Sequence, residues 1–151
     1  MLYTERRGKR INLINHALFY MDDLLLIGSS KKNVKMASKL LENYLKEELN
    51  LSLKPNYQLF PIDSRPIDMM GYKIYTYKTT VRRRIFNNAN KIFVKYKNPK
   101  NVLTLHDAQK IVSYYGYFKY SYSYKYMNKI KLKKTLTKAK EMISNESKSK
   151  L

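Results

Sequence analysis

Two adjacent aspartates, Asp22 and Asp23, are the residues of this chain best suited to carry out chemistry. Like charges repel when a fold holds them together, and a divalent cation bound between them relieves that repulsion. Magnesium prefers such hard oxygen ligands and keeps open positions for phosphate oxygens. Two such ions, about 4 Å apart, activate a 3′-hydroxyl and stabilise leaving pyrophosphate in nucleotidyl transfer. In most proteins an Asp-Asp pair is only a solvated turn, so the dipeptide alone indicates no particular activity.

The residues around the aspartates predict a β-hairpin that carries the pair at its turn. Apolar and β-branched segments flank the pair within residues 11–28, so we expect a hairpin buried on at least one face. A three-residue loop, in which Asp accepts unusual dihedral angles, would join the strands. A helix then begins at Ser29 or Ser30 and ends near Asn50. Its apolar stripe, which must lie against another part of the protein, consists of Ala37, Leu40, Leu41, Tyr44, Leu45 and Leu49.

The remaining residues predict short strands followed by helices, which together give an α+β fold. Residues 51–61 alternate like an edge strand broken by Pro55, and residues 67–77 predict a strand or strand pair with a bulge or close backbone approach at Gly71. Residues 81–96 and 104–120 predict helices. Thr104 and Asp107 form a capping box at the start of the second, whose apolar stripe consists of Ala108, Ile111, Val112, Tyr115 and Phe118. The Lys-rich tail is expected to fray beyond Met142.

The charge balance indicates a polyanionic partner. The 151 residues include 31 Lys and Arg against 11 Asp and Glu, giving a net charge of +20. A compact chain with this charge repels itself, and nucleic acid is the first candidate to neutralise it. An anionic membrane is the second, but no separate basic amphipathic helix supports it. A Lys-, Asn- and Tyr-rich composition also reflects an AT-rich genome, which weakens the argument from charge.

The other bulk features predict a soluble cytoplasmic protein of one domain or two small lobes. Apolar residues make up 44% of the chain, which is enough for a core, and cysteine is absent. Disulfides and thiolate metal sites are therefore excluded. The longest apolar run, Leu24 to Ile27, is far too short to span a membrane.

Several segments, in order, resemble those of reverse transcriptases. The run from Phe19 to Asp23, followed by residues 24–28, resembles the Tyr-X-Asp-Asp motif of that family, with apolar strands on both sides and a long amphipathic helix after it. Residues 67–72 resemble the primer-grip segment Asp-Phe-Leu-Gly-Tyr, and residues 53–61 resemble the strand before it. Residues 81–84 and 112–119 are similar to thumb segments. The set is most similar to the enzymes of bacterial diversity-generating retroelements and their phage relatives.

This resemblance implies a partial polymerase palm, made of the β-hairpin, the helix and short antiparallel strands, followed by an α-helical thumb. Residues 1–78 would be the C-terminal part of the palm and residues 79–143 the thumb, with residues 144–151 a disordered tail. The implied activity is RNA-directed DNA polymerisation with Mg²⁺ as cofactor and Mn²⁺ as the alternative. The implied partners are an RNA template, a DNA primer and deoxynucleoside triphosphates, with no membrane.

The resemblance also assigns roles to individual residues. Asp22 would be the stronger metal ligand and Asp23 the second catalytic carboxylate, while Tyr20 and Met21 would lie near the primer end. Met69, Met70, Gly71 and Tyr72 would hold the primer strand, although both methionines could equally fill the core. Nucleic-acid contacts are further expected from Arg82, Arg83, Arg84, Lys91, Lys95, Tyr117 and Tyr120, with Tyr124 a further candidate.

Two departures from the family pattern predict that the isolated chain is catalytically incomplete. The lysine expected after the motif helix is replaced by Asn56-Tyr57-Gln58, which leaves its role unfilled or assigns it to Lys54. A third palm aspartate is also absent, because Glu5 is the only acidic residue before Tyr20. We therefore expect a separate chain to carry the fingers and the N-terminal palm.

Two alternatives remain open at this point. A non-catalytic, basic nucleic-acid-binding remnant would keep the charge without the chemistry, and the basic stretch could also be a solvated helix face. A group II intron maturase is disfavoured by Met21, where that family often has Ala. His16 and His106 lie too far from matching residues to suggest a metal site.

Overall fold

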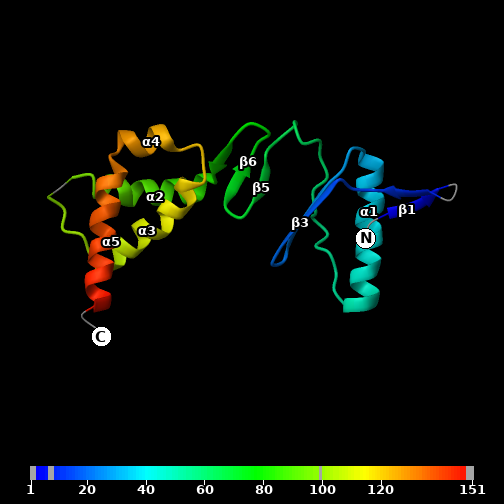
Figure 1. Cartoon of the computed structure of the whole chain (residues 1–151), viewed down its shortest axis with the longest axis horizontal. Helices are drawn as coiled ribbons and strands as arrows, with labels where there is room; N and C mark the ends of the chain where they lie inside the picture. The colour runs from blue at the N-terminus through cyan, green and yellow to red at the C-terminus, as the bar shows by residue number, and fades with distance from the viewer. Residues whose placement is uncertain (1–2, 7–8, 99, 149–151) are drawn as a thin grey trace. The chain divides into compact units, whose positions relative to one another are not determined.

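The computed structural model describes residues 3–6, 9–98 and 100–148, with side chains from residue 12 onward. Two compact units make up the chain, Met1–Ser64 and Arg65–Leu151, here called unit 1 and unit 2. Both contain small antiparallel sheets and helices (Figure 1), which confirms the predicted α+β class. None of the helices in the described ranges is both long and apolar enough to cross a membrane.

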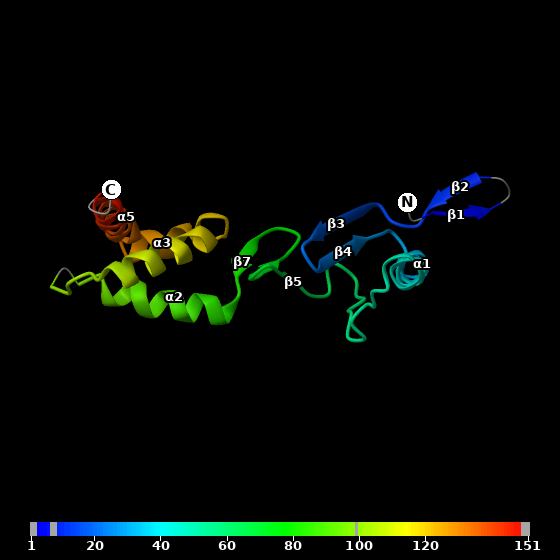
Figure 2. The ribbon, with the colours of Figure 1, turned by 90° about the horizontal axis from the view of Figure 1, so that it is seen from below.

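Unit 1 consists of two hairpins and one long helix. Strands β1 (Tyr3–Arg6) and β2 (Lys9–Asn12) pair antiparallel, as do β3 (His16–Tyr20) and β4 (Asp23–Ile27), and helix α1 (Lys31–Leu49) follows. The hairpin of β1 and β2 was not expected from the sequence. Figure 2 shows both hairpins as separate ribbons beside α1.

Helix α1 has the predicted boundaries. Ser30 is extended at the N-cap position, and Asn50 ends the helix in the left-handed region with φ 51°. A Cβ at Gly28 would lie 2.7 Å from Val34 Cγ2 and 3.1 Å from the Leu13 carbonyl oxygen. Glycine therefore lets the first turn of α1 lie close to the segment between β2 and β3, and Leu13, Val34 and Ala37 are buried.

Burial in unit 1 is smaller than the sequence predicts. All of β3 is exposed, including Phe19 at 65%, although burial of one face was expected. Within the described residues, β3 and β4 pair only with each other, so no further strand covers their apolar side chains. The predicted stripe on α1 is likewise incompletely covered, since Leu40, Tyr44 and Leu49 are exposed.

Residues 51–66 contain no strand, so the predicted edge strand is wrong. Turns occupy this segment, with hydrogen bonds from the Tyr57 amide to the Lys54 carbonyl and from the Ser64 amide to the Pro61 carbonyl. Pro55, Pro61 and Pro66 each lack the N–H that a strand ladder uses. Proline therefore prevents a strand in this segment, although its apolar residues alternate as a strand would require.

Unit 2 contains a three-stranded antiparallel sheet and a group of helices. The sheet has the order β5 (Ile67–Met69), β6 (Tyr72–Ile74) and β7 (Thr79–Val81). The helices are α2 (Arg83–Lys95), α3 (Leu105–Lys119), α4 (Tyr124–Lys129) and α5 (Leu132–Lys148). Strand β7 was missed, because Val81 was assigned to the helix that begins at Arg83.

The start of α3 confirms the predicted N-cap. The Thr104 hydroxyl accepts a hydrogen bond from the Asp107 amide at 3.2 Å, which satisfies one otherwise unpaired N–H of the first turn. The end of the chain differs from expectation, since α5 continues through Lys148 instead of fraying beyond Met142. Burial of Leu132, Leu136 and Ala139 anchors the start of α5, which favours the helical conformation of the residues that follow.

The core of unit 2 is centred on aromatic rings of α2, α3 and α4. Phe93, Phe118, Ile111 and Leu132 are its largest fully buried side chains. The Phe118 ring lies 5.2 Å from Phe93 and 5.6 Å from Tyr126, measured between ring centroids. The Tyr126 hydroxyl donates to Asn90 Oδ1 at 2.6 Å, and burial raises the pKa of Tyr126. Packing of this kind holds the helices and, through Val81, the end of the sheet together.

Candidate functional site

The Asp22-Asp23 pair lies at the tip of the hairpin formed by β3 and β4. Tyr20 pairs with Asp23, so Met21 and Asp22 are the two central residues of the turn. The sequence predicted a three-residue loop with the unusual dihedral angles at Asp. Instead Met21 has the positive φ of 52°, which for a residue with a side chain costs about 1 kcal/mol. Strained backbone of this kind is concentrated at functional sites, which makes the turn the first candidate.

Both aspartates are exposed and available to a ligand. No side chain in the described ranges forms a hydrogen bond or ion pair with either carboxylate. Water stabilises these exposed charges, so the fold does not depend on a cation bound between them.

The donor chemistry of the turn fits magnesium, but only as part of a complete ligand set. Carboxylate oxygens are the hard ligands that Mg²⁺ takes, usually one or two from protein with the rest from water and phosphate. Over the residues that the structure describes, no group of three or more His, Cys, Asp or Glu could hold a metal ion. Glu5 lies outside the residues with described side chains. Asp22 and Asp23 can thus supply two carboxylates to a metal ion.

A second predicted segment forms the turn between β5 and β6. Met69 pairs with Tyr72, and the central residues Met70 and Gly71 have φ values of 50° and 83°. Positive φ at both positions is the pattern of a type I′ hairpin turn, so Gly71 is a turn residue and not a bulge. Met69 is buried, as expected of a core methionine, whereas Met70 is 37% exposed. Of the two methionines, Met70 is the one that a ligand can reach.

Gly71 also brings several predicted residues together. A Cβ there would lie 2.7 Å from both Ile85 Cδ1 and Tyr117 Cε1, so the close approach expected at this glycine is to side chains of α2 and α3. The Tyr72 and Tyr117 rings are 5.6 Å apart, and burial, together with Tyr117 and Tyr120, raises the pKa of Tyr72. The Arg82 amide donates to the Gly71 carbonyl at 2.8 Å.

The three consecutive arginines differ in their surroundings. Arg82 donates from Nε and Nη2 to Asp68 Oδ1 at 2.9 and 2.6 Å, so its charge is compensated within the sheet region. Arg83 and Arg84 are exposed at the start of α2, and Lys91 is exposed two turns later. In the described part of unit 2 no acidic side chain pairs with these three. They are the better candidates for phosphate contacts.

A shallow groove between α2 and α3 adds a residue that the sequence analysis missed. Arg84, Asn88, Lys110, Ser113 and Tyr117 line it, among others. Lys110 lies seven residues before Tyr117, so the two share a helix face. That spacing was the signal that could have identified Lys110.

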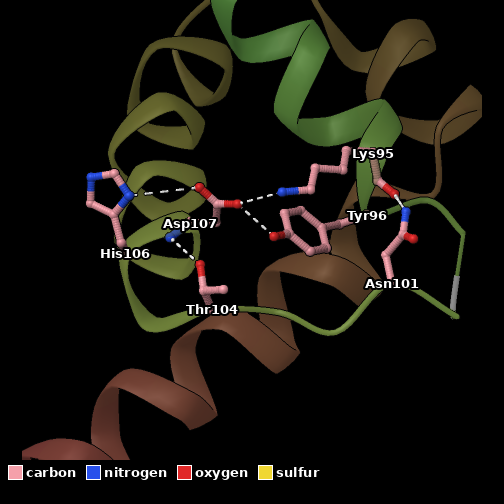
Figure 3. A network of polar contacts seen from close by, with 6 residues as sticks. All are labelled: Lys95, Tyr96, Asn101, Thr104, His106 and Asp107. Carbon is pink, nitrogen blue, oxygen red and sulfur yellow. Dashed lines mark hydrogen bonds and ion pairs between the residues drawn. The ribbon is translucent and has the colours of Figure 1, made fainter.

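Lys95 was predicted to contact nucleic acid, but it pairs with Asp107 (Figure 3). Lys95 Nζ and the Tyr96 hydroxyl both donate to Asp107 Oδ2, at 2.9 and 2.5 Å, and thereby join the end of α2 to the start of α3. Hydrogen bonds from Tyr96 and Lys95 hold the pKa of Asp107 below its usual value, and those from Lys95 to Tyr96 and Asp107 raise the pKa of Lys95. Asn101 donates to the Lys95 carbonyl, and His106 Nδ1 lies 3.8 Å from Asp107 Oδ1. This cluster is a structural clamp between the two helices.

Replacing Asp107 by Asn is expected to lower the free energy of unfolding by about 1 kcal/mol at pH 7, because the acceptor of two donors is weakened. The folded pKa of Asp107 lies below the usual value of 3.8. Its contribution to stability is therefore complete above that value and is lost as the pH falls through the folded pKa. Urea unfolding at pH 7 and pH 3 should show a larger acid-induced loss for wild type than for the variant. Exposed Asp63→Asn is the control, and an equal loss in wild type and Asp107→Asn would contradict the prediction.

The predicted tyrosines are divided between core and surface. Tyr117 is half-buried between the Gly71 turn and the groove, while Tyr120 is 68% exposed. Tyr124 is also exposed, and so is Tyr122, which the sequence analysis did not single out.

Neither protein-family models nor the curated proteins give a match to this chain. The resemblance to reverse transcriptases therefore remains a prediction from the motifs.

Proposed function

We propose that this chain supplies the metal-binding turn, primer grip and thumb of an RNA-directed DNA polymerase. The observation that carries the proposal is the Asp22-Asp23 pair, which is exposed at the strained Met21-Asp22 turn and has no partner among the described side chains. Its flanking strands, the helix after it and the Met70-Gly71 turn follow in the order that the resemblance implies.

The proposed roles follow from what each residue offers. Magnesium bound at the turn would activate the 3′-hydroxyl of the primer and neutralise charge on the leaving pyrophosphate. Asp22 and Asp23 would hold the metal, and Tyr20 and Met21 would border the primer end. In unit 2, the exposed Met70 and the Gly71 backbone would contact the primer strand, and Arg83, Arg84 and Lys91 its phosphates.

The charge of unit 2 supports its role in binding the template and primer. Asp107 is the only acidic residue between Asp68 and Glu141, and its carboxylate already accepts hydrogen bonds from Lys95 and Tyr96. Most lysines and arginines of this stretch are therefore free of acidic neighbours in sequence. Each phosphate that they neutralise releases counterions, so affinity for an RNA–DNA duplex should fall steeply with salt.

The proposal includes a second polypeptide that contributes the missing parts of the site. The resemblance to reverse transcriptases implies a third palm carboxylate, and no third one lies with Asp22 and Asp23 among the described residues. A separate chain with the fingers and a third palm carboxylate would complete it. Template, primer and deoxynucleoside triphosphates would bind to the assembled enzyme.

Terbium luminescence tests the metal assignment without requiring activity. Terbium(III) takes hard oxygen ligands and emits when a nearby tyrosine is excited, and the chain contains no tryptophan to interfere. Tyr20 lies opposite Asp23 in the hairpin and is the expected donor. Asp22→Asn with Asp23→Asn should remove most of the emission, and magnesium should compete for the site in wild type.

The matched control is Glu47→Gln with Glu48→Gln in α1, which makes the same charge change at another exposed, adjacent pair. This control should keep the emission. Equal losses from both double variants would mean that terbium binds acidic groups without preference, and would contradict the metal assignment.

A non-catalytic nucleic-acid-binding protein is the second candidate. The observation that favours it is the lack of a third ligand near Asp22 and Asp23 in the described ranges, together with the basic unit 2. Both candidates predict salt-dependent duplex binding, whereas only the polymerase predicts a metal site at the turn. Duplex binding without turn-specific terbium emission would therefore favour the second.

A further inference from the structure

Three exposed tyrosines lie close together where α3 passes into α4. Tyr120, Tyr122 and Tyr124, here called the tyrosine ridge, are 68%, 75% and 73% exposed. Single exposed aromatic residues are common on protein surfaces, but three exposed rings within five residues concentrate aromatic surface on one short segment. In the core nearby, Phe118 and Tyr126 show that aromatic residues of the same segment can be buried.

Contacts of the intervening residues keep the ridge in place. Ser121 and Ser123 alternate with the tyrosines and face inward, with their hydroxyl oxygens 2.5 Å apart. The Ser121 hydroxyl also donates to the Phe118 carbonyl at 3.2 Å. The Tyr122 amide donates to the Thr79 carbonyl at 2.7 Å, which fastens the segment to β7 (Figure 2). Because the backbone is anchored, binding would not have to order it.

Lysines lie at the ridge and in the loop between β6 and β7. Lys119 Nζ lies 5.0 Å from the centre of the Tyr120 ring, and Lys125 follows Tyr124. In the loop that leads to Thr79, Lys78 Nζ lies 5.1 Å from the Tyr77 ring, which is 76% exposed. No acidic residue occurs in residues 69–80 or 117–131. The surface thus combines exposed rings with positive charge, which complements a polyanion that also has flat apolar faces.

We propose that the tyrosine ridge stacks against unpaired bases of single-stranded nucleic acid. The inference rests on the nucleic-acid binding in the proposed function but not on its metal chemistry. A base offers a ring face to each tyrosine, while the backbone phosphates meet Lys119 and Lys125. In a duplex the bases are already stacked on one another, so the ridge selects single strands, such as template beyond the paired region.

Binding of fluorescein-labelled oligothymidylate of about twelve nucleotides, followed by fluorescence anisotropy, tests the ridge. Tyr122→Ala should weaken binding by about tenfold, whereas Tyr122→Phe keeps the ring and should bind like wild type. An abasic strand of the same length and charge should bind wild type about tenfold more weakly than oligothymidylate. Tyr44→Ala in α1, which removes another exposed tyrosine, is the matched control and should change nothing.

Two results would overturn this proposal alone. Equal affinity of wild type for abasic and thymidylate strands would show that the bases do not contribute to binding. Unchanged affinity of Tyr122→Ala would show that the strand does not bind at the tyrosine ridge. An RNA–DNA duplex measured in parallel separates these failures from those of the proposed function. If neither the duplex nor the single strand binds, both proposals fail. A far-UV circular dichroism spectrum of Tyr122→Ala that matches wild type, and wild-type affinity of Tyr122→Phe, would show that a loss of affinity does not come from misfolding.

Discussion

Asp22→Asn is expected to lower magnesium-dependent primer extension by about a thousandfold, which corresponds to about 4 kcal/mol of transition-state stabilisation. The substitution keeps the size of the side chain at the exposed turn but replaces a charged oxygen ligand with a neutral amide. Because the carboxylate has no described partner in the protein, the fold should not change. The activity is measured on an RNA template with a DNA primer, using the chain co-expressed with polypeptides encoded beside it.

Two controls define what this experiment shows. Glu47→Gln makes the same change of charge on α1 and should leave extension unaltered, and the chain on its own should show no extension. Extension that survives the replacement of both Asp22 and Asp23 would refute their role as metal ligands. Extension by the chain on its own would instead show that it needs no third carboxylate from a partner.

Phe118→Ala is expected to destabilise unit 2 by about 4 kcal/mol, because a fully buried ring is lost and a cavity remains. The ring contacts Phe86, Phe93 and Tyr126, with centroid distances of 5.7, 5.2 and 5.6 Å. A loss of this size is a large part of the total stability of a typical domain. Urea unfolding followed by far-UV circular dichroism measures the effect.

Val94→Ala provides the comparison on a neighbouring surface. Val94 is 49% exposed on α2, so its truncation should change the free energy of unfolding by less than about 0.5 kcal/mol. A Phe118→Ala variant that loses less than 1 kcal/mol would mean that the helices repack around the missing ring. The aromatic cluster would then not be the main source of stability in unit 2.

Features defined by short-range patterns were predictable from the sequence. The boundaries of α1, the Thr104 cap and the apolar stripe of α3 were confirmed, because caps and helical periodicity depend on residues a few positions apart. The hydroxyl cap expected from a serine at the start of α1 is wrong, since the Ser30 side chain makes no capping hydrogen bond. The antiparallel hairpin that carries Asp22 and Asp23 was predicted for the same reason. The α+β class followed from these elements.

Other features depend on contacts that the sequence pattern does not contain. Proline at three positions removed the expected strand from residues 51–66, and β7 was missed because Val81 was assigned to the helix that begins at Arg83. The pairing of Lys95 with Asp107 arises from the packing of α2 on α3, which the spacing of charges could not predict. The exposure of β3 depends on which strands lie beside it, so a pattern that indicated a buried hairpin was insufficient.

The lack of space at Gly71 has a structural consequence. The turn between β5 and β6 fits against Ile85 of α2 and Tyr117 of α3, and the Gly71 carbonyl accepts a hydrogen bond from the Arg82 amide. A residue with a side chain at position 71 would have to displace Ile85 and Tyr117. A change confined to this turn would therefore also disturb the packing of α2 and α3.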